Sequence, residues 1–330
     1  MTAFDNTPSP YLSVVIPVYG CAACLPELHR RLSAALISIT ADYQLVFVND
    51  HSPDHSWEVV LELAARDSLV LGLDLSRNFG QHAALTAGLD RARGEWVVVM
   101  DCDLQDVPEE IPRLYAHALD QQLDIVFGRR VARQDAAQKR LVGHVFHRLL
   151  AWLGGPAQDP ATGNFGIFHR RVVAALGRLR EPARAFPLQV HWLGFRRGAL
   201  DVQHAARPQG RSSYCFGQLL RLAFNVLLAY SDKPLRLLVK LGGGITTGAL
   251  LYAVYLAWLA VAGQGLAVLA VLLASVWLLG GLSLAALGLV GLYVARTFDS
   301  VKNRPLYVVR DEVGGTLISS PPVVTIIFDS

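Results

Sequence analysis

The sequence predicts an α/β protein with a mainly parallel sheet, followed by two apolar helices that can span a membrane. Three observations lead to this prediction. Short β-branched runs alternate with helical segments through the first half of the chain. Polar residues follow consecutive predicted strands. Residues 241–293 contain no Asp, Glu, Lys, Arg or His. We therefore expect a sheet domain with a site at one edge, and a separate membrane anchor.

The predicted strands are short runs rich in Val, Ile and Leu, a composition typical of strands buried in a sheet. They are expected at residues 12–18, 44–49, 69–75, 95–100 and 124–128. Helical segments with appropriate starting residues lie between them. These helices are expected at residues 24–39, 54–66, 81–93 and 108–121. Alternation on this scale indicates βαβ units, whose ligands bind beyond the carboxyl ends of the strands.

Composition and missing motifs exclude several kinds of protein. A net charge of +3 is too small to indicate a nucleic-acid partner. Cys21 and Cys24 lack a second pair that would complete a zinc site. Residues 1–10 do not have the basic start and apolar run of a signal peptide, so we expect the first domain to be cytoplasmic. Phosphate loops of the GxxxxGK[ST] and GxGxxG types are also missing, so phosphates are expected to bind a metal and arginines.

Polar side chains gather where three predicted strands end. Asp50 follows the second strand, Asn78 the third, and Asp101 and Asp103 the fourth. A single residue such as Asn78 is equally well explained as a turn former. Two carboxylates at i and i+2, however, are suited to Mg²⁺ or Mn²⁺, which also binds the phosphates of a substrate. Such a cation stabilises the negative charge that builds up on a diphosphate leaving group.

These motifs, in this order, resemble family 2 glycosyltransferases of the GT-A fold, especially bacterial polyprenyl-phosphate glycosyltransferases and dolichol-phosphate mannose synthases. The resemblance rests on residues 13–19, 48–54, 76–80 and 101–106, and it extends to residues 207–214 and 231–236. It implies a Rossmann-like GT-A domain, a nucleotide-sugar donor, a polyprenyl phosphate acceptor and Mg²⁺ or Mn²⁺ as cofactor.

The resemblance also implies roles for individual residues. Those expected to contact the nucleotide are Pro17, Tyr19 and Asp50. Those expected to bind the metal and the donor diphosphate are Asp101, Asp103 and Gln105, with Asp103 also catalytic. The arginines expected to bind phosphates of the donor or the lipid are Arg129, Arg207 and Arg211. For the last two, a solvated basic loop is the alternative explanation.

The chain departs from the family pattern at two places. Gly20 and Cys21 follow the first motif where members commonly continue with Asn-Glu, so the identity of the base stays open. Asn164 replaces the Asp of a Gly-Asp-Phe motif, and Asp159 is the nearby carboxylate that could act as a base instead, although Asp-Pro is also a common turn. A phosphate monoester acceptor, with a second pKa near 6, is already ionised and needs no base. A sugar hydroxyl would need one.

The C-terminal third predicts a membrane hairpin. Residues 241–262 and 266–293 are each long enough to cross a bilayer, which takes about 20 helical residues, and Gly263-Gln264-Gly265 permits a tight turn between them. Basic residues flank both outer ends, which predicts that both ends are on the cytoplasmic side of the inner membrane. Small residues in the second span favour close helix packing and a possible homo-oligomer; they are Gly280, Gly281, Gly288 and Gly291.

The expected organisation is a cytoplasmic GT-A domain at residues 1–212, a juxtamembrane helix at 213–240, the two spans at 241–295 and a cytoplasmic tail at 296–330. The apolar stripe of the juxtamembrane segment fits an interfacial helix, with a core helix as the alternative. The favoured function is inverting, metal-dependent transfer of a hexose or hexose derivative to undecaprenyl phosphate. The alternatives are transfer to a saccharide hydroxyl, and an inactive membrane scaffold. A processive synthase would be expected to carry Gln-x-x-Arg-Trp, and residues 189–192 do not match it.

Overall fold

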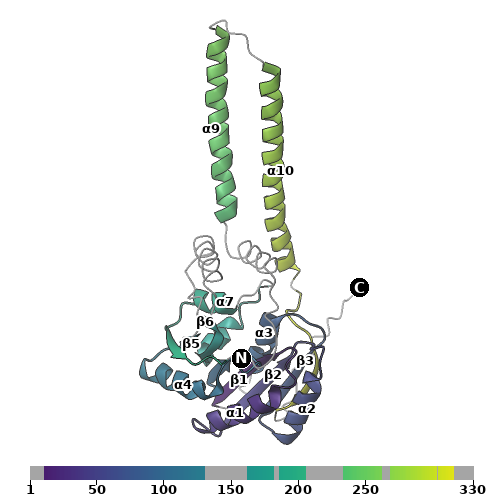
Figure 1. The fold of residues 1–330 in the computed structure, drawn as a ribbon, viewed down its shortest axis with the longest axis vertical. Helices are drawn as coiled ribbons and strands as arrows, with labels where there is room; N and C mark the ends of the chain where they lie inside the picture. The colour runs from purple at the N-terminus through teal and green to yellow at the C-terminus, as the bar shows by residue number, and fades with distance from the viewer. Residues whose placement is uncertain are drawn as a thin grey trace, which may run out of the picture. The chain divides into compact units, whose positions relative to one another are not determined.

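The computed structural model describes residues 11–130, 162–181, 186–205, 233–261, 268–302 and 304–315. The chain divides into two units. The first comprises Met1–Gln134, Asp159–Arg211 and Pro305–Ser330, and it contains the sheet (Figure 1). The second comprises Asp135–Gln158 and Ser212–Arg304, and it contains two long helices.

The described strands form one eight-stranded sheet in the order β7-β5-β6-β4-β1-β2-β3-β8. Their bounds are β1 Leu12–Val18, β2 Tyr43–Asn49, β3 Val70–Leu75, β4 Trp96–Val99, β5 Ile125–Arg130, β6 Thr162–His169, β7 Arg197–Val202 and β8 Val309–Gly314. The central strands β3, β2, β1 and β4 pair in parallel. By contrast, β6 pairs antiparallel with β4 and β5, and β8 pairs antiparallel with β3. The sheet is therefore parallel at its centre and mixed toward both edges.

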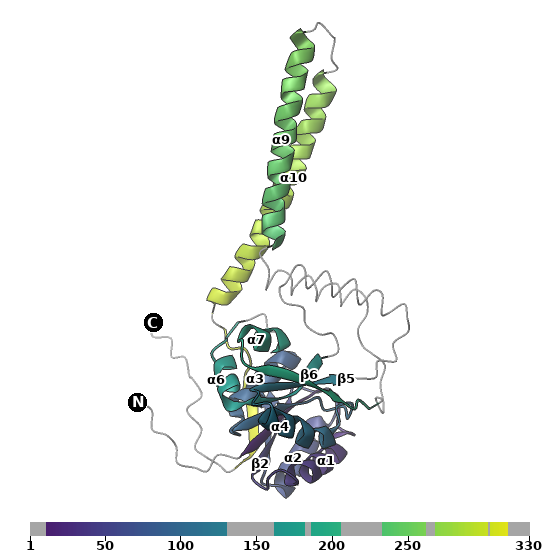
Figure 2. The ribbon, with the colours of Figure 1, turned by 90° about the vertical axis from the view of Figure 1, so that its left-hand side faces the viewer.

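Helices cover both faces of this sheet (Figure 2). One face packs against α1 (Leu25–Ile37), α2 (Ser56–Arg66) and α4 (Ile111–Asp120), the last preceded by the short helix η1 (Pro108–Glu110). The other packs against α3 (Gln81–Arg91), α6 (Arg170–Leu176) and α7 (Phe186–Trp192). Side chains of β1 alternate between the two cores, with Val14 and Ile16 on the α1 face and Val15 on the α3 face. Because β1 is buried on both faces, its sequence is apolar apart from Ser13 and does not alternate.

The strands and helices predicted for residues 12–128 are confirmed, with small shifts at their ends. The predicted helix at residues 108–121 is divided into η1 and α4. The last predicted strand extends to Arg130. The antiparallel strands β6 and β8 were not predicted.

Strand β8 lies in the segment that the sequence assigned to a C-terminal tail. It pairs with the edge of β3, with Leu73 opposite Glu312 and Asp74 opposite Asp311. The chain therefore leaves the sheet after β7, passes through the second unit, and returns to the same sheet. Strand β8 thereby forms the edge of the sheet beside β3.

The second unit contains α9 (Lys233–Val261) and α10 (Val268–Val301), which run side by side in both views (Figures 1 and 2). Among the described residues, one helical stretch, Leu278–Val301, is long and apolar enough to cross a membrane. The other predicted span, residues 241–262, falls within α9 except for its last residue, which lies outside the described part. Large apolar side chains of α9 are exposed, including Leu251, Val254 and Trp258. The two-span hairpin stays a prediction.

Candidate functional site

The predicted site residues converge at one edge of the sheet. Tyr19 follows β1, Asp50 follows β2 and Asp101 follows β4, and these three strands are parallel neighbours. Their carboxyl ends therefore meet at the same edge, where α/β sheets bind ligands. Pro17 is buried within β1, whereas 55% of Tyr19 is exposed. Tyr19 is thus accessible to a ligand at this edge, and Pro17 shapes the backbone beneath it.

Asp50 follows the end of β2, and its side chain hydrogen-bonds with the loop that follows β3. Its side chain is only 3% exposed, and its two oxygens accept hydrogen bonds from the backbone N–H groups of Phe79 (2.8 Å) and Gly80 (2.9 Å). Gly80 has φ +94°, a conformation that favours glycine and that lets successive N–H groups face one carboxylate. Burial raises the pKa of Asp50 above its usual value, although both hydrogen bonds and nearby His51 oppose this shift. Asp50 therefore holds two loops of the site together, and its nucleotide contact stays a prediction.

The loop after β4 presents the predicted metal ligands. Asp101, Asp103 and Gln105 are all partly exposed. Asp101 Oδ1 accepts a hydrogen bond from Gln81 Nε2 (2.7 Å), and Asp103 Oδ1 accepts one from the backbone N–H of Gln105 (3.1 Å). Leu104, between them, has φ +61°, a conformation that is uncommon outside glycine and is enriched at functional sites.

The donor set of this loop fits a hard divalent cation. Across the described ranges, no three His, Cys, Asp or Glu side chains are grouped so that they could hold a metal by themselves. Asp101, Asp103 and the amide of Gln105 would instead provide a few oxygen ligands, leaving positions for water and substrate phosphates. That partial coordination is typical of Mg²⁺ bound together with a phosphorylated substrate.

Cys102 separates the two carboxylates and points into the core. It is buried, and its thiol hydrogen-bonds with Cys21. That hydrogen bond and burial raise the pKa of Cys102 well above its usual value, so the thiol is neutral. Cys102 thus faces inward from the turn that presents Asp101 and Asp103.

Asp106 and Gln81 support the metal loop, and sequence reasoning assigned neither of them. Asp106 is buried, and its Oδ2 accepts a hydrogen bond from the backbone N–H of Asp101 (3.2 Å). Its Oδ1 lies 3.7 Å from His204 Nδ1, and residues 106 and 204 form an antiparallel bridge. The position of Gln81 after the third strand was the available signal. For Asp106 the sequence indicated less, because its supporting role depends on the burial of its side chain, which can be seen only in the folded structure.

The predicted phosphate-binding arginines are only partly described. Arg129, on β5, pairs with Asp201, which lies opposite it on β7. The guanidinium of Arg129 lowers the pKa of Asp201. Arg207, Arg211 and Asp159 lie outside the described residues. The roles of all four predicted residues therefore stay predictions.

Asn164 lies close to the metal loop along the sheet. It belongs to β6, which pairs antiparallel with β4 so that Val99 is opposite Gly166. The paired residues end at Val99 and Gly166, so Asn164 lies beyond them, on the side where β4 ends and the loop with Asp101 begins. The position that carries a carboxylate in many family members thus lies at the site edge and carries an amide in this chain.

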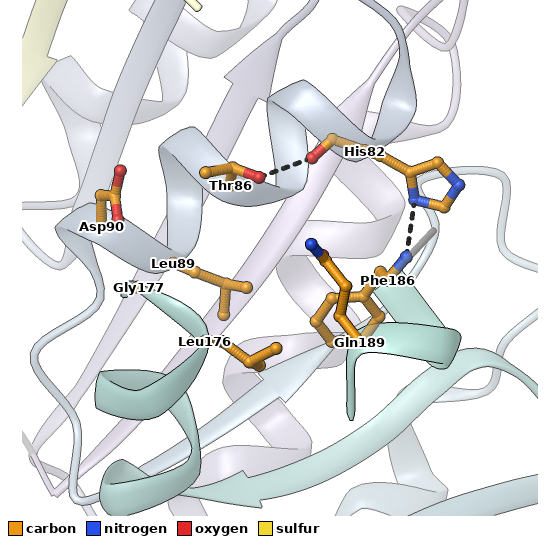
Figure 3. A pocket seen from close by; sticks show the side chains of 8 residues that line it. All are labelled: His82, Thr86, Leu89, Asp90, Leu176, Gly177, Phe186 and Gln189. Atoms are coloured by element: carbon orange, nitrogen blue, oxygen red, sulfur yellow. Dashed lines mark hydrogen bonds between the residues drawn. The ribbon is translucent and has the colours of Figure 1, made fainter. Parts of the chain in front are cut away.

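A small pocket lies between α3, α6 and α7 (Figure 3). Its lining includes His82, Thr86, Phe186 and Gln189. His82 Nδ1 accepts a hydrogen bond from the backbone N–H of Phe186 (3.4 Å), which ties the start of α3 to the start of α7. The side-chain nitrogen of Gln189 is buried there without a hydrogen-bond partner among the residues that the structure describes. Sequence reasoning did not predict this pocket.

Comparison with known proteins agrees with this geometry. The profile of "Glycosyl transferase family 2" matches residues 13–176. An undecaprenyl-phosphate 4-deoxy-4-formamido-L-arabinose transferase of Pseudomonas aeruginosa (strain LESB58) is 36% identical over 326 residues, covering 95% of this chain and 94% of the relative. The protein of the same name from Shewanella sediminis (strain HAW-EB3) is 35% identical over 309 residues, covering 92% and 93%.

Among solved structures, the mannosyltransferase PcManGT from Pyrobaculum calidifontis, in complex with GDP-Man and Mn²⁺, has a TM-score of 0.44 and 16% identity to this chain. That similarity covers 92% of this chain and 90% of the mannosyltransferase.

Proposed function

The chain belongs to glycosyl transferase family 2, and on that premise we propose that it transfers a sugar from a nucleotide donor to undecaprenyl phosphate. The observation that carries this proposal is the near full-length similarity to undecaprenyl-phosphate transferases. The sequence led us to expect a hexose or hexose derivative. The name of the relatives instead suggests a formamido-arabinose, a pentose, as the first donor sugar to test.

Asp101, Asp103 and Gln105 would hold Mg²⁺ or Mn²⁺ against the donor diphosphate. When bound, the cation would supply positive charge to the departing nucleoside diphosphate. Gln81 orients Asp101, and Asp106 fixes the backbone at that residue. The ligands are therefore pre-positioned by neutral hydrogen bonds and by a buried carboxylate.

Asn164 favours an acceptor that arrives ionised. Near neutral pH the lipid phosphate is largely a dianion, since its second pKa is near 6. One of its oxygens attacks the anomeric carbon opposite the diphosphate, the new C–O bond forms, and the nucleoside diphosphate leaves with the electrons of the old bond. This single displacement inverts the anomeric centre and requires no proton transfer. Asp159 would matter only for a hydroxyl acceptor.

Helices α9 and α10 would anchor the enzyme in the inner membrane as a two-span hairpin. The pairing of β8 with β3 supports this proposal. Since β7 and β8 belong to one sheet, the chain between them must start and finish on the same side of any membrane that it crosses. An even number of spans satisfies this condition. The basic residues at both outer ends support a cytoplasmic location for that side.

The test uses the purified full-length chain in detergent with labelled UDP-, GDP- and dTDP-sugars, including the UDP-linked formamido-arabinose. Undecaprenyl phosphate is offered as the acceptor, and the product is partitioned between organic solvent and water. We expect label in the organic phase, lost in EDTA and in Asp103→Ala but retained in the control Asp120→Ala, which removes an exposed carboxylate of α4.

Other outcomes would select the alternatives. Label transferred only to a water-soluble saccharide would replace the lipid acceptor with a sugar hydroxyl. Absence of any transfer or donor hydrolysis with all donors would favour an inactive scaffold. Full activity in EDTA, or in Asp103→Ala, would refute the metal role.

A further inference from the structure

The returning strand β8 places a positive charge on a carboxylate buried in the sheet. Asp74, on β3, has no exposed surface, and its Oδ2 forms an ion pair with the guanidinium of Arg310 on β8. This oxygen has no other hydrogen-bond partner among the described residues. Arg310 is therefore the group that compensates the charge of Asp74, and a buried carboxylate without such compensation is strongly unfavourable.

Asp74 in turn orients a residue at the nucleotide end of the site. Its Oδ1 accepts a hydrogen bond from Asn49 Nδ2 (2.7 Å), and Asn49 is itself buried at the end of β2. The side-chain oxygen of Asn49 accepts a hydrogen bond from the backbone N–H of Ser52 (3.3 Å). Asn49 thus fixes both ends of the short loop that includes Asp50, a predicted nucleotide contact.

The segment around β8 also contacts α3. The hydroxyl of Tyr307 donates to Asp90 Oδ2 (2.7 Å), and Arg91 pairs with Glu312 (2.9 Å). Asp90 and Arg91 lie at the end of α3. These contacts help to hold β8 in register. They are more exposed than the ion pair of Asp74 and are therefore expected to be weaker. They also lie outside the series of contacts that runs from Arg310 through Asp74 to Asn49.

We infer that Arg310 is a positioning residue for donor binding, acting through Asp74 and Asn49 on the loop at residues 50–52. This inference deepens the proposed function, since it assumes a nucleotide-sugar donor at the β1–β2–β4 edge. Arg310 pairs with the carboxylate of Asp74, and Asp74 accepts the hydrogen bond that holds the amide of Asn49 in the orientation that accepts from Ser52. The last part of the chain would thereby complete a site built from the first hundred residues.

Arg310→Met tests this inference because it keeps the apolar stem and removes the charge. We expect the KM for the donor to rise about tenfold, equivalent to about 1.4 kcal/mol of lost binding, with kcat changed less than about twofold. A mainly structural defect would lower the amount of active enzyme, and hence kcat, without this change in KM. Arg310→Lys, which keeps a positive charge, should restore a KM close to that of the parent.

Two further variants control for folding and for β8 itself. Asp74→Asn combined with Arg310→Met removes both charges, and it should recover the donor KM to within about threefold of the parent if the unpaired charge causes the defect. Arg91→Met breaks the more exposed ion pair between α3 and Glu312 of β8. It should leave the KM for the donor within about twofold of the parent value. Dissociation constants for UDP, GDP and dTDP, measured by calorimetry well below the unfolding temperature, provide a readout independent of the acceptor.

The outcomes separate this inference from the proposed function. An unchanged donor KM and nucleotide affinity in Arg310→Met, in a parent that transfers sugar, would overturn the inference alone. If the parent binds a nucleotide but transfers sugar to a saccharide, the proposed lipid acceptor is wrong. The donor KM of Arg310→Met would still test the role of Arg310. A parent that binds none of the three nucleotides would overturn both. If Arg310→Met does not fold, a double variant that folds with a parental KM supports the inference, and one with a raised KM refutes it.

Discussion

Gly88→Ala is expected to destabilise the sheet domain by steric overlap. Gly88 lies in α3 directly over the sheet, and an added Cβ would lie 2.3 Å from Val15 Cγ1 and 3.1 Å from Val48 Cγ2. An unstrained contact between carbons is about 3.5–4.0 Å. Both valines belong to central, fully buried strands, so the helix must shift rather than the side chains.

The expected magnitude combines two opposing effects. Overpacking a well-packed core costs about 1–3 kcal/mol, and the rigid surroundings favour the upper end. Alanine gains about 1 kcal/mol over glycine within a helix. The net loss is therefore about 2 kcal/mol, which for a domain of this size lowers the unfolding temperature by about 4–8 °C.

Gly177→Ala is the matched control, because its added Cβ would lie no closer than 3.5 Å to any atom and its φ of −61° suits alanine. It should leave the unfolding temperature unchanged or raise it slightly. Both variants are compared with the parent by thermal unfolding in the same detergent at one heating rate. An unfolding temperature of Gly88→Ala equal to or above that of Gly177→Ala would refute the packing argument.

Three further predictions concern Asp50 and two ion pairs, Arg31 with Glu109 and Arg129 with Asp201. Asp50→Asn should lower the free energy of unfolding by about 1–2 kcal/mol in chemical denaturation, since one backbone N–H then faces an amide NH₂; an unchanged value would contradict this. The pKa of Glu109 is lowered by Arg31, so their pair stabilises the fold above a pH of about 4.3 and is lost as the pH falls through the lowered pKa. Arg31→Met should therefore be less stable than the parent by at most about 1 kcal/mol at pH 7 and equally stable near pH 3 in pH-dependent unfolding, because the pair is largely exposed; a difference that persists at pH 3 would exclude the ion pair as its cause. Arg129→Met should raise the KM for donor or lipid in steady-state kinetics, whereas Asp201→Asn should not. Equal increases in KM would mean that Arg129 acts through its ion pair with Asp201 rather than by binding a phosphate.

The central part of the fold could be predicted because its signals are local. The runs that form β1 and β2 are apolar apart from Ser13, Gln44 and Asn49, and Pro and Asp mark the starts of the following helices. The convergence of Asp50 with Asp101 also followed from the sequence, since it requires only that neighbouring strands be parallel.

The outer strands could not be predicted because their signals are not local. Strand β8 contains Arg310, Asp311 and Glu312 in a row, which reads as an exposed tail. Its place in the sheet depends on Asp74, which is distant in the sequence, and on the open edge of β3. The partnership of Arg129 with Asp201 is hidden for the same reason, since it needs the order of β5 and β7. Neither can be recognised without the topology.

The position of β8 also determines the order in which the protein can be completed during synthesis. The ribosome makes β3 early and β8 only after α9 and α10, so the newly made sheet has an unpaired edge at β3 until both helices have been made. An open strand edge is a site for pairing with other chains. Strand β8 then pairs with that edge, and its charged side chains oppose pairing with other chains. The sheet domain thus gains its last edge strand only after both apolar helices have been synthesised.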